Sequence, residues 1–117
     1  MDKELEWLKD NMPEGWGLVL CLDGEYMPMC EYRLYESDGD FATTVYTDHG
    51  DIGLGSVTAL LKQELLRMRW YCHTFQSKQR KWSCCLQRGR IRLGKCRDKD
   101  TEFEAVMAAY REQRLHG

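Results

Sequence analysis

Short apolar runs separated by Gly- and Asp-containing turns constrain the fold of this chain most strongly. The longest apolar run, Gly17 to Leu22, has only the length of a strand. The turn signal Asp23-Gly24 follows it, and the next is Ser37-Asp38-Gly39-Asp40. No run approaches the roughly 18 apolar residues that a membrane span needs, and the first residues do not resemble a signal peptide. We therefore expect a domain in the cytoplasm with no membrane contact.

The periodicity of the apolar residues between these turns predicts helices and strands. Helices are expected where apolar residues recur every three to four positions, and strands where β-branched, aromatic and apolar residues cluster. The expected helices cover Asp2–Met12, Val57–Arg69 with Ser56 as its N-cap, and a final segment that the capping-box residues Thr101 and Glu104 open. The expected strands cover Trp16–Leu22, Tyr26–Tyr35, Phe41–Thr47, Tyr71–Phe75, Lys81–Gln87 and Arg90–Cys96.

The resulting order, α-β-β-β-α-β-β-β-α, predicts an α+β fold. We expect a mainly antiparallel sheet packed by two to three helices, in one sandwich domain over residues 1–117. A length of 117 residues suits a single domain, and the apolar share of 43% is sufficient for a core.

Six cysteines and three histidines raise the question of a metal site. Structural zinc sites usually contain ligand pairs separated by two to four residues, and the cysteines here form no such pair. Cys84 and Cys85 are adjacent, so in a strand they point to opposite faces. We expect reduced thiols, as is usual in the cytosol, with no metal and no cofactor.

The charges of this chain are segregated by sequence half. Residues 1–58 hold 13 acidic and three basic side chains, a net charge of −10. Residues 59–117 hold 14 basic and six acidic side chains, a net charge of +8. The segment Arg67–Arg97 contains ten Lys or Arg residues and no Asp or Glu. Such asymmetry indicates a charged partner, either a protein or a nucleic acid, although the two halves could also neutralise each other within one domain.

The most compact basic segment is the expected hairpin around Gly89. In a strand, Ile91 and Leu93 face inward while Arg90 and Arg92 face outward, about 7 Å apart. That spacing suits a phosphate backbone or an acidic protein face. Exposed basic residues on an edge strand also deter aggregation, so this pattern does not require a partner. The candidate partner-binding residues of this basic face are Arg88, Arg90, Arg92 and Lys95.

The aromatic residues Trp70, Tyr71, Phe75 and Trp82 flank this basic segment. If their rings are exposed, they suit stacking on single-stranded bases. If they are buried, they belong to the core.

The acidic half offers an alternative face. Its candidate residues, which could imitate phosphates and engage a basic protein, are Asp23, Glu25, Asp38 and Asp40. Aspartate is also favoured in turns, because its side chain bonds the local backbone. Both interpretations of these residues remain open.

Motifs of catalysis are absent from the sequence. It contains no P-loop, no Gly fingerprint for nucleotides, no H-E-x-x-H and no G-x-S-x-G. His49, between Asp48 and Asp51, is the histidine most suggestive of a site, because carboxylates could orient it. A single loop histidine is usually a surface residue, and we expect no enzymatic activity.

The second half of the chain resembles the phage ABA sandwich domain. The resemblance extends over Asp48–Gln113 and rests on Asp48–Ile52 followed by a helix, the Trp-led strand Trp82–Leu86 and the final helix Thr101–Ala109. The family's usual Cys-Arg-Ala-Ala is replaced here by Val106-Met107-Ala108-Ala109. The resemblance implies a phage or prophage protein that acts by binding, for example an inhibitor of a host protein such as a defence nuclease. It transfers no site residue, and nucleic-acid binding through residues 88–97 is the alternative.

Overall fold

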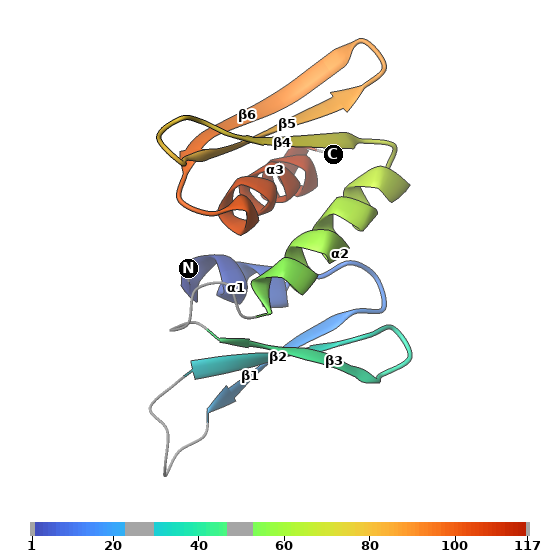
Figure 1. Ribbon diagram of the computed structural model, residues 1–117. Coiled ribbons are helices and arrows are strands. Elements are labelled where there is room, and N and C mark those ends of the chain that lie inside the picture. Colours follow the sequence, from blue (N-terminus) through green and yellow to red (C-terminus); the bar gives the residue numbers. More distant parts are fainter. Residues whose placement is uncertain (1, 23–29, 47–52, 117) are drawn as a thin grey trace. The chain divides into compact units, whose positions relative to one another are not determined.

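The elements of the chain follow the order expected from the sequence (Figure 1). The computed structural model describes residues 2–22, 30–46 and 53–116. Its helices are α1 (Asp2–Lys9), α2 (Leu54–Arg67) and α3 (Glu102–His116). Its strands are β1 (Gly17–Leu22), β2 (Cys30–Tyr35), β3 (Phe41–Tyr46), β4 (Tyr71–Gln76), β5 (Trp82–Arg88) and β6 (Ile91–Lys99). The prediction of an α+β fold with this succession of elements is confirmed.

The strands expected as one antiparallel sheet form two sheets of three strands. Their orders are β1-β2-β3 and β4-β5-β6, and every pairing is antiparallel. The residues of the chain also divide into two compact units, a first unit of residues 1–57 and a second unit of residues 58–117. Each sheet therefore belongs to one unit, and the division lies inside α2, after Val57.

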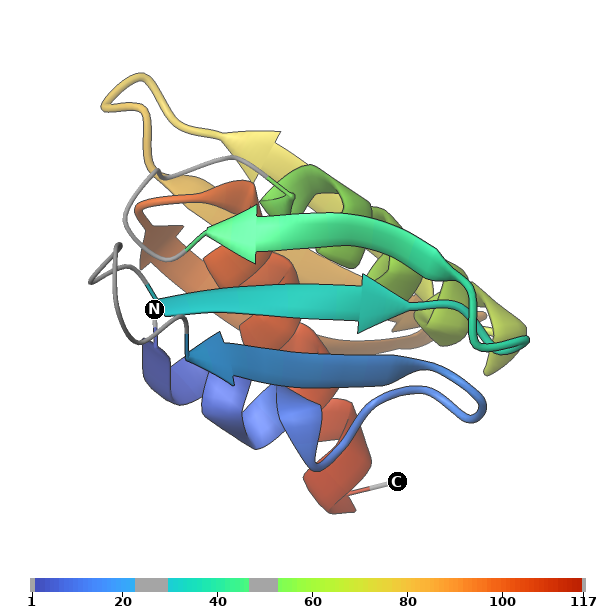
Figure 2. The same ribbon diagram turned by 90° about the horizontal axis from the view of Figure 1, so that it is seen from below.

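In the first unit, β2 is the central strand of the sheet (Figure 2). The pairs Leu18–Leu34 and Tyr32–Val45 lie opposite each other across the strands, and all four side chains are buried. Burial of one face at alternate positions explains why these segments form strands. Helix α1 packs against β1 and contributes two more buried leucines, Leu5 and Leu8.

Helix α1 is shorter than the sequence predicted, because it ends at Lys9 rather than Met12. The Asn11 side-chain amide donates a hydrogen bond to the Trp7 carbonyl over 2.8 Å, and the Asn11 backbone N–H donates to the Leu8 carbonyl. An asparagine that satisfies a terminal carbonyl of a helix in this way ends the helix before Pro13.

The turn between β2 and β3 is stabilised by aspartate. The Asp40 backbone N–H donates to the Asp38 carboxylate over 3.0 Å, and Gly39 has a φ of +90°. Asp38 therefore has the turn function that the sequence offered as an alternative to a binding face. The other turn signal, Asp23-Gly24, lies outside the described residues.

Helix α2 begins at Leu54, so the prediction of Ser56 as its N-cap is wrong. The chain enters the helix earlier because Gly53 adopts a φ of +78°, and the Val57 N–H donates to the Gly53 carbonyl over 3.3 Å. Gly53 also lies directly against β3: a Cβ at this position would come within 2.1 Å of the Thr44 carbonyl oxygen. A residue with a side chain does not fit there.

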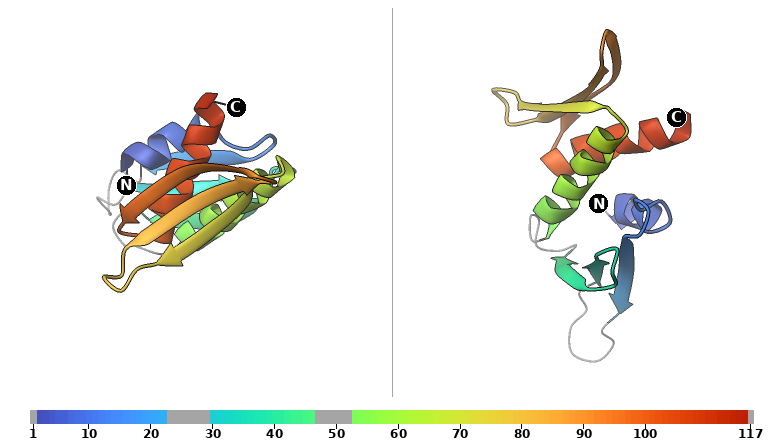
Figure 3. Two further views of the ribbon diagram at one scale, coloured as in Figure 1. Left: turned by 90° about the horizontal axis from the view of Figure 1, so that it is seen from above. Right: turned by 90° about the vertical axis from the view of Figure 1, so that its right-hand side faces the viewer.

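In the second unit, α3 lies on one face of the β4-β5-β6 sheet, which we call the inner face (Figure 3). The Glu104 N–H donates to the Thr101 hydroxyl over 3.1 Å, so the expected cap of this helix is confirmed. Cys84 and Leu86 of β5 are buried on the inner face. The buried residues of α3 are Phe103, Ala105, Val106, Met107, Ala109 and Tyr110.

Substitution of Gly53 tests the close approach of α2's first turn to β3. Gly53→Ala should lower the free energy of unfolding by more than about 2 kcal/mol, because the new methyl group meets the Thr44 carbonyl and the left-handed backbone disfavours alanine. Urea unfolding followed by circular dichroism measures this loss.

Gly39→Ala is the matched control. Gly39 also has a positive φ, but an added Cβ there has no atom within 4 Å, so only the backbone penalty of about 1 kcal/mol applies. Equal losses in the two variants would contradict the close contact at Gly53.

Candidate binding surface on the outer face of the second sheet

The face of the β4-β5-β6 sheet opposite α3, which we call the outer face, is covered by no described helical residue of the second unit (Figure 3, left). The strand register identifies its side chains. Tyr71 lies opposite Gln87, which lies opposite Arg92 on the third strand. The remaining outer-face positions alternate with the buried inner ones. The outer face comprises Tyr71, His73, Phe75, Ser83, Cys85, Gln87 and Arg92.

Three ring side chains stand in a row on β4. Tyr71 is 61% exposed and Phe75 is 57% exposed, and His73 between them is also exposed. Alternate residues of a strand lie about 7 Å apart on one face, so the rings are evenly spaced. Since β4 is an edge strand, the row borders solvent on one side. Large apolar side chains grouped at the surface are typical of binding sites.

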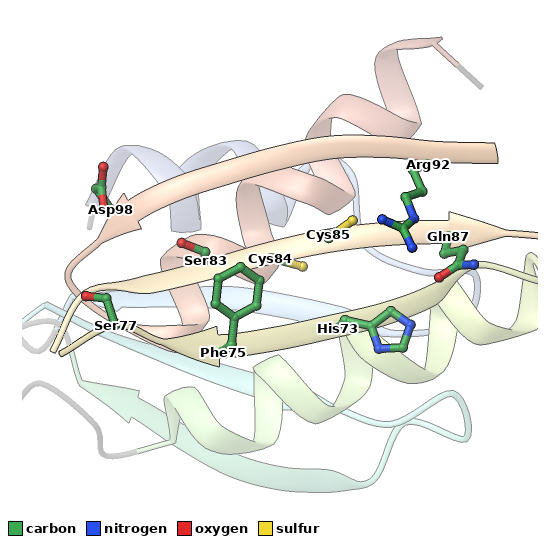
Figure 4. A pocket seen from close by; sticks show the side chains of 9 residues that line it. All are labelled: His73, Phe75, Ser77, Ser83, Cys84, Cys85, Gln87, Arg92 and Asp98. Carbon is green, nitrogen blue, oxygen red and sulfur yellow. The ribbon is translucent and has the colours of Figure 1, made fainter. Parts of the chain in front are cut away.

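A hollow of about 640 Å³ lies beside this row (Figure 4). Phe75 and His73 project from β4 on the outer side of the sheet. Arg92 and Gln87 lie at one end of the hollow, and Asp98 lies at the other. The hollow is lined by His73, Phe75, Ser77, Ser83, Cys84, Cys85, Gln87, Arg92 and Asp98.

The basic residues predicted from the hairpin have different environments. Arg90 lies in the turn between β5 and β6, and both it and Arg92 are exposed. Arg92 lines the hollow. Ile91 pairs with Arg88, on the same side of the sheet as the buried Leu86, but it is 54% exposed because it stands at the tip of the hairpin. Lys95 belongs to β6, and its side chain lies outside the described part of the structure.

Arg88 has a structural role. Its guanidinium carbon lies 4.2 Å from the centre of the Trp70 ring, and the guanidinium also donates to the Met68 carbonyl. These contacts connect the end of β5 to the segment that follows α2. A cation held over an indole ring in this manner stabilises a fold by about 0.5–2 kcal/mol.

The two tryptophans are not the stacking platform. Trp70 is only 3% exposed and belongs to the core, and its indole N–H has no hydrogen-bond partner among the described residues. Trp82 is half-buried and alternates with outer-face Ser83. The exposed rings are instead Tyr71 and Phe75. Both are among the aromatic residues that the sequence analysis offered for stacking, and the period of two in Tyr71–Phe75 places both rings on one face.

Two exposed arginines occupy backbone conformations that favour glycine. Arg69 has a φ of +68° and follows the last turn of α2, where the Trp70 N–H donates to the Leu65 carbonyl. Arg80 has a φ of +62° in the turn between β4 and β5. A side chain in this conformation costs about 1–2 kcal/mol. Asp98 shares this conformation, with a φ of +60°.

Of the predicted acidic residues, only Asp38 and Asp40 lie in the part of the chain that the structure describes. Asp38 and Asp40 form the turn described above, while Asp23, Glu25 and the loop of Asp48, His49 and Asp51 lie outside the described residues. Within residues 2–22, 30–46 and 53–116, no group of three or more His, Cys, Asp or Glu side chains could hold a metal ion. None of the described helices is both long and apolar enough to cross a membrane.

Comparisons with protein-family models, with curated proteins and with solved structures gave no match to this chain. The resemblance to the phage ABA sandwich domain therefore stays a prediction.

The structural role of Arg88 predicts a stability loss on its removal. Arg88→Ala should lower the free energy of unfolding by about 1–2 kcal/mol, because the Trp70 ring loses its cation and the Met68 carbonyl loses a donor. The measurement is urea unfolding followed by tryptophan fluorescence.

Arg90→Ala, two residues away in the exposed turn, is the matched control. It should change stability by less than about 0.5 kcal/mol, as surface substitutions usually do. Equal effects of the two substitutions would show that the contact of Arg88 with Trp70 contributes nothing.

Proposed function

We propose that this protein binds single-stranded nucleic acid on the outer face of the β4-β5-β6 sheet. The observation that carries the proposal is the row of exposed rings formed by Tyr71, His73 and Phe75 beside Arg92. Proteins that recognise single strands place the bases on aromatic rings exposed on a sheet or groove and attract the phosphates with basic side chains. Exposed rings and a basic side chain are both present on this face.

The charge of the second unit supports an anionic ligand. Residues 58–117 carry 14 basic and six acidic side chains, so this unit has a net charge of +8 although the whole chain has −2. Such a unit attracts phosphates at long range. Exposed basic residues in its described part include Arg69, Lys78, Arg80, Arg90 and Arg92.

The spacing of the rings matches a strand of nucleic acid. Neighbouring rings on β4 are about 7 Å apart, which is about twice the 3.4 Å rise between stacked bases. The three rings can therefore hold bases of a partly extended strand that runs along β4. Gln87 and Arg92 lie across the sheet from Tyr71, so they can contact base edges or phosphates of that strand.

A protein partner is the second candidate. Tyr71 and Phe75 are exposed apolar side chains on the same face as Arg92, and apolar, aromatic and arginine side chains together are typical of the centre of protein interfaces. The partner would be a host protein such as a defence nuclease, as the resemblance to phage proteins implies. Both candidates are non-catalytic and act in the cytoplasm of a bacterial host.

Fluorescence anisotropy with a labelled single-stranded oligonucleotide tests the first candidate. Tyr71→Ala and Phe75→Ala should each weaken binding by about tenfold or more, because stacking on a ring contributes about 1–3 kcal/mol per base. The dependence of affinity on salt should stay unchanged in these variants. Phe41→Ala removes an exposed aromatic ring of the first unit and should leave binding unchanged.

The double variant Arg90→Ala with Arg92→Ala should reduce the slope of log affinity against log salt by about 1.4, corresponding to two phosphate contacts. Unchanged affinity in the Tyr71 and Phe75 variants would refute stacking on this face. Capture of partners from bacterial lysate tests the second candidate. One dominant protein that stays bound after nuclease treatment, and that the Arg92→Ala variant does not capture, would favour it.

Replacement of Arg69 by glycine should change stability and binding in opposite directions. Arg69→Gly should raise the free energy of unfolding by up to about 1 kcal/mol, because glycine adopts the left-handed conformation without strain, and should weaken nucleic-acid binding. Arg69→Lys is the matched control, since lysine keeps both the positive charge and a side chain in the left-handed conformation. It should leave both stability and binding nearly unchanged. An equal loss of affinity in both variants would show that the charge of Arg69 is not used.

A further inference from the structure

Two thiols meet on the inner face of the second sheet, on the side opposite the proposed binding surface. The Sγ atoms of Cys72 and Cys84 are 3.0 Å apart. Cys72 lies opposite Leu86 and Cys84 lies opposite Thr74, so the two cysteines are diagonal neighbours on adjacent antiparallel strands. Both side chains therefore point to the same face of the sheet.

The two cysteines differ in access to solvent. Cys84 is completely buried, whereas Cys72 is half-buried on the edge strand β4. A reagent in solution can therefore reach Cys72 first. Cys85, which is half-buried, follows Cys84 but points to the outer face, so it stands apart from this pair.

The surroundings of Cys72 favour its thiolate. The hydrogen bond with the Cys84 thiol is the main cause that lowers the pKa of Cys72. Burial opposes this effect, the Lys62 ammonium lowers the pKa further, and the Glu102 carboxylate raises it. Lys62 and Glu102 form an ion pair of 2.6 Å between α2 and α3. The thiolate is the form of cysteine that attacks a disulfide.

We propose that Cys72 and Cys84 form a dithiol that a small disulfide, such as oxidised glutathione, converts reversibly into an intramolecular disulfide. The Cys72 thiolate attacks one sulfur of the small disulfide, and the other sulfur leaves as a thiolate. The Cys84 thiol then loses its proton and attacks the Cys72 sulfur of this mixed disulfide, which releases the second small thiolate. Two cysteine thiols are oxidised and one small disulfide is reduced to two thiols.

Closure starts from two sulfur atoms that already lie close together. The sulfur atoms must approach from 3.0 Å to the disulfide bond length of about 2.05 Å. Cys72 lies on an edge strand, whose backbone is paired on one side only and can adjust. The disulfide would hold β4 to β5 directly beneath Tyr71 and His73. The inference does not depend on the proposed nucleic-acid binding.

Peptide mapping of the full-length protein tests the proposal. The protein is reduced, desalted and incubated with oxidised glutathione, and the remaining thiols are alkylated. Cleavage after lysine and arginine places Cys72 in peptide 70–78 and both Cys84 and Cys85 in peptide 82–88. Fragmentation of the joined peptides should assign the bond to Cys72 and Cys84, with Cys85 alkylated. Dithiothreitol should release the two peptides.

Two variants determine the order of attack. Cys84→Ala should retain glutathione on Cys72 as a stable mixed disulfide, because the second thiol is missing. Cys85→Ala should close the disulfide as the unaltered protein does. A bond from Cys72 to Cys85, or alkylation of Cys72 and Cys84 after oxidation of the unaltered protein, would overturn the proposal.

The pH dependence of alkylation provides a further check. In the unaltered protein, Cys72 should react with iodoacetamide with a midpoint at lower pH than in Cys84→Ala. The direction follows because loss of the hydrogen bond removes the main cause that lowers the pKa of Cys72. Equal midpoints in the unaltered protein and in Cys84→Ala would show that the Cys84 thiol does not affect the pKa of Cys72.

Discussion

Burial of Cys84 and Leu86 on the inner face is the constraint on which the arrangement of the second unit depends. Side chains of a strand alternate between the two faces, so a register with these two residues under α3 leaves Ser83, Cys85 and Gln87 outside. The pairing with β4 then places its three rings on the outer face and Cys72 on the inner face. A slip by one residue would bury the rings and expose the thiol pair. The candidate binding surface and the dithiol thus follow from the same register.

The division into two units gives the charge segregation a structural meaning. The boundary after Val57 separates the 13 acidic side chains of the first unit from the 14 basic side chains of the second. The net charge of −2 for the whole chain therefore describes neither unit. A ligand that approaches the outer face of the second sheet meets a unit with an excess of positive charge, which determines the sign of the ligand that it attracts.

The arginines of the second unit differ in their effect on stability. Arg88 contributes to stability, because it covers a buried indole ring and bonds a backbone carbonyl. Arg69 and Arg80 instead decrease stability, because their backbone conformation favours glycine. Strain that is retained at the surface is typical of functional positions, where selection acts on the side chain rather than on the fold.

The sequence by itself determined the order of the elements, because the periods of strands and helices are local properties of neighbouring residues. It also determined the cap at Thr101 and the turn at Asp38. Tertiary structure alone decided that the strands form two sheets, that α2 begins beside Thr44, that Trp70 is buried and that Ile91 is exposed. It also decided that Cys72 meets Cys84. These features depend on which distant segments pair and which faces a helix covers, and contacts between residues far apart in the chain leave no periodic signal in the sequence.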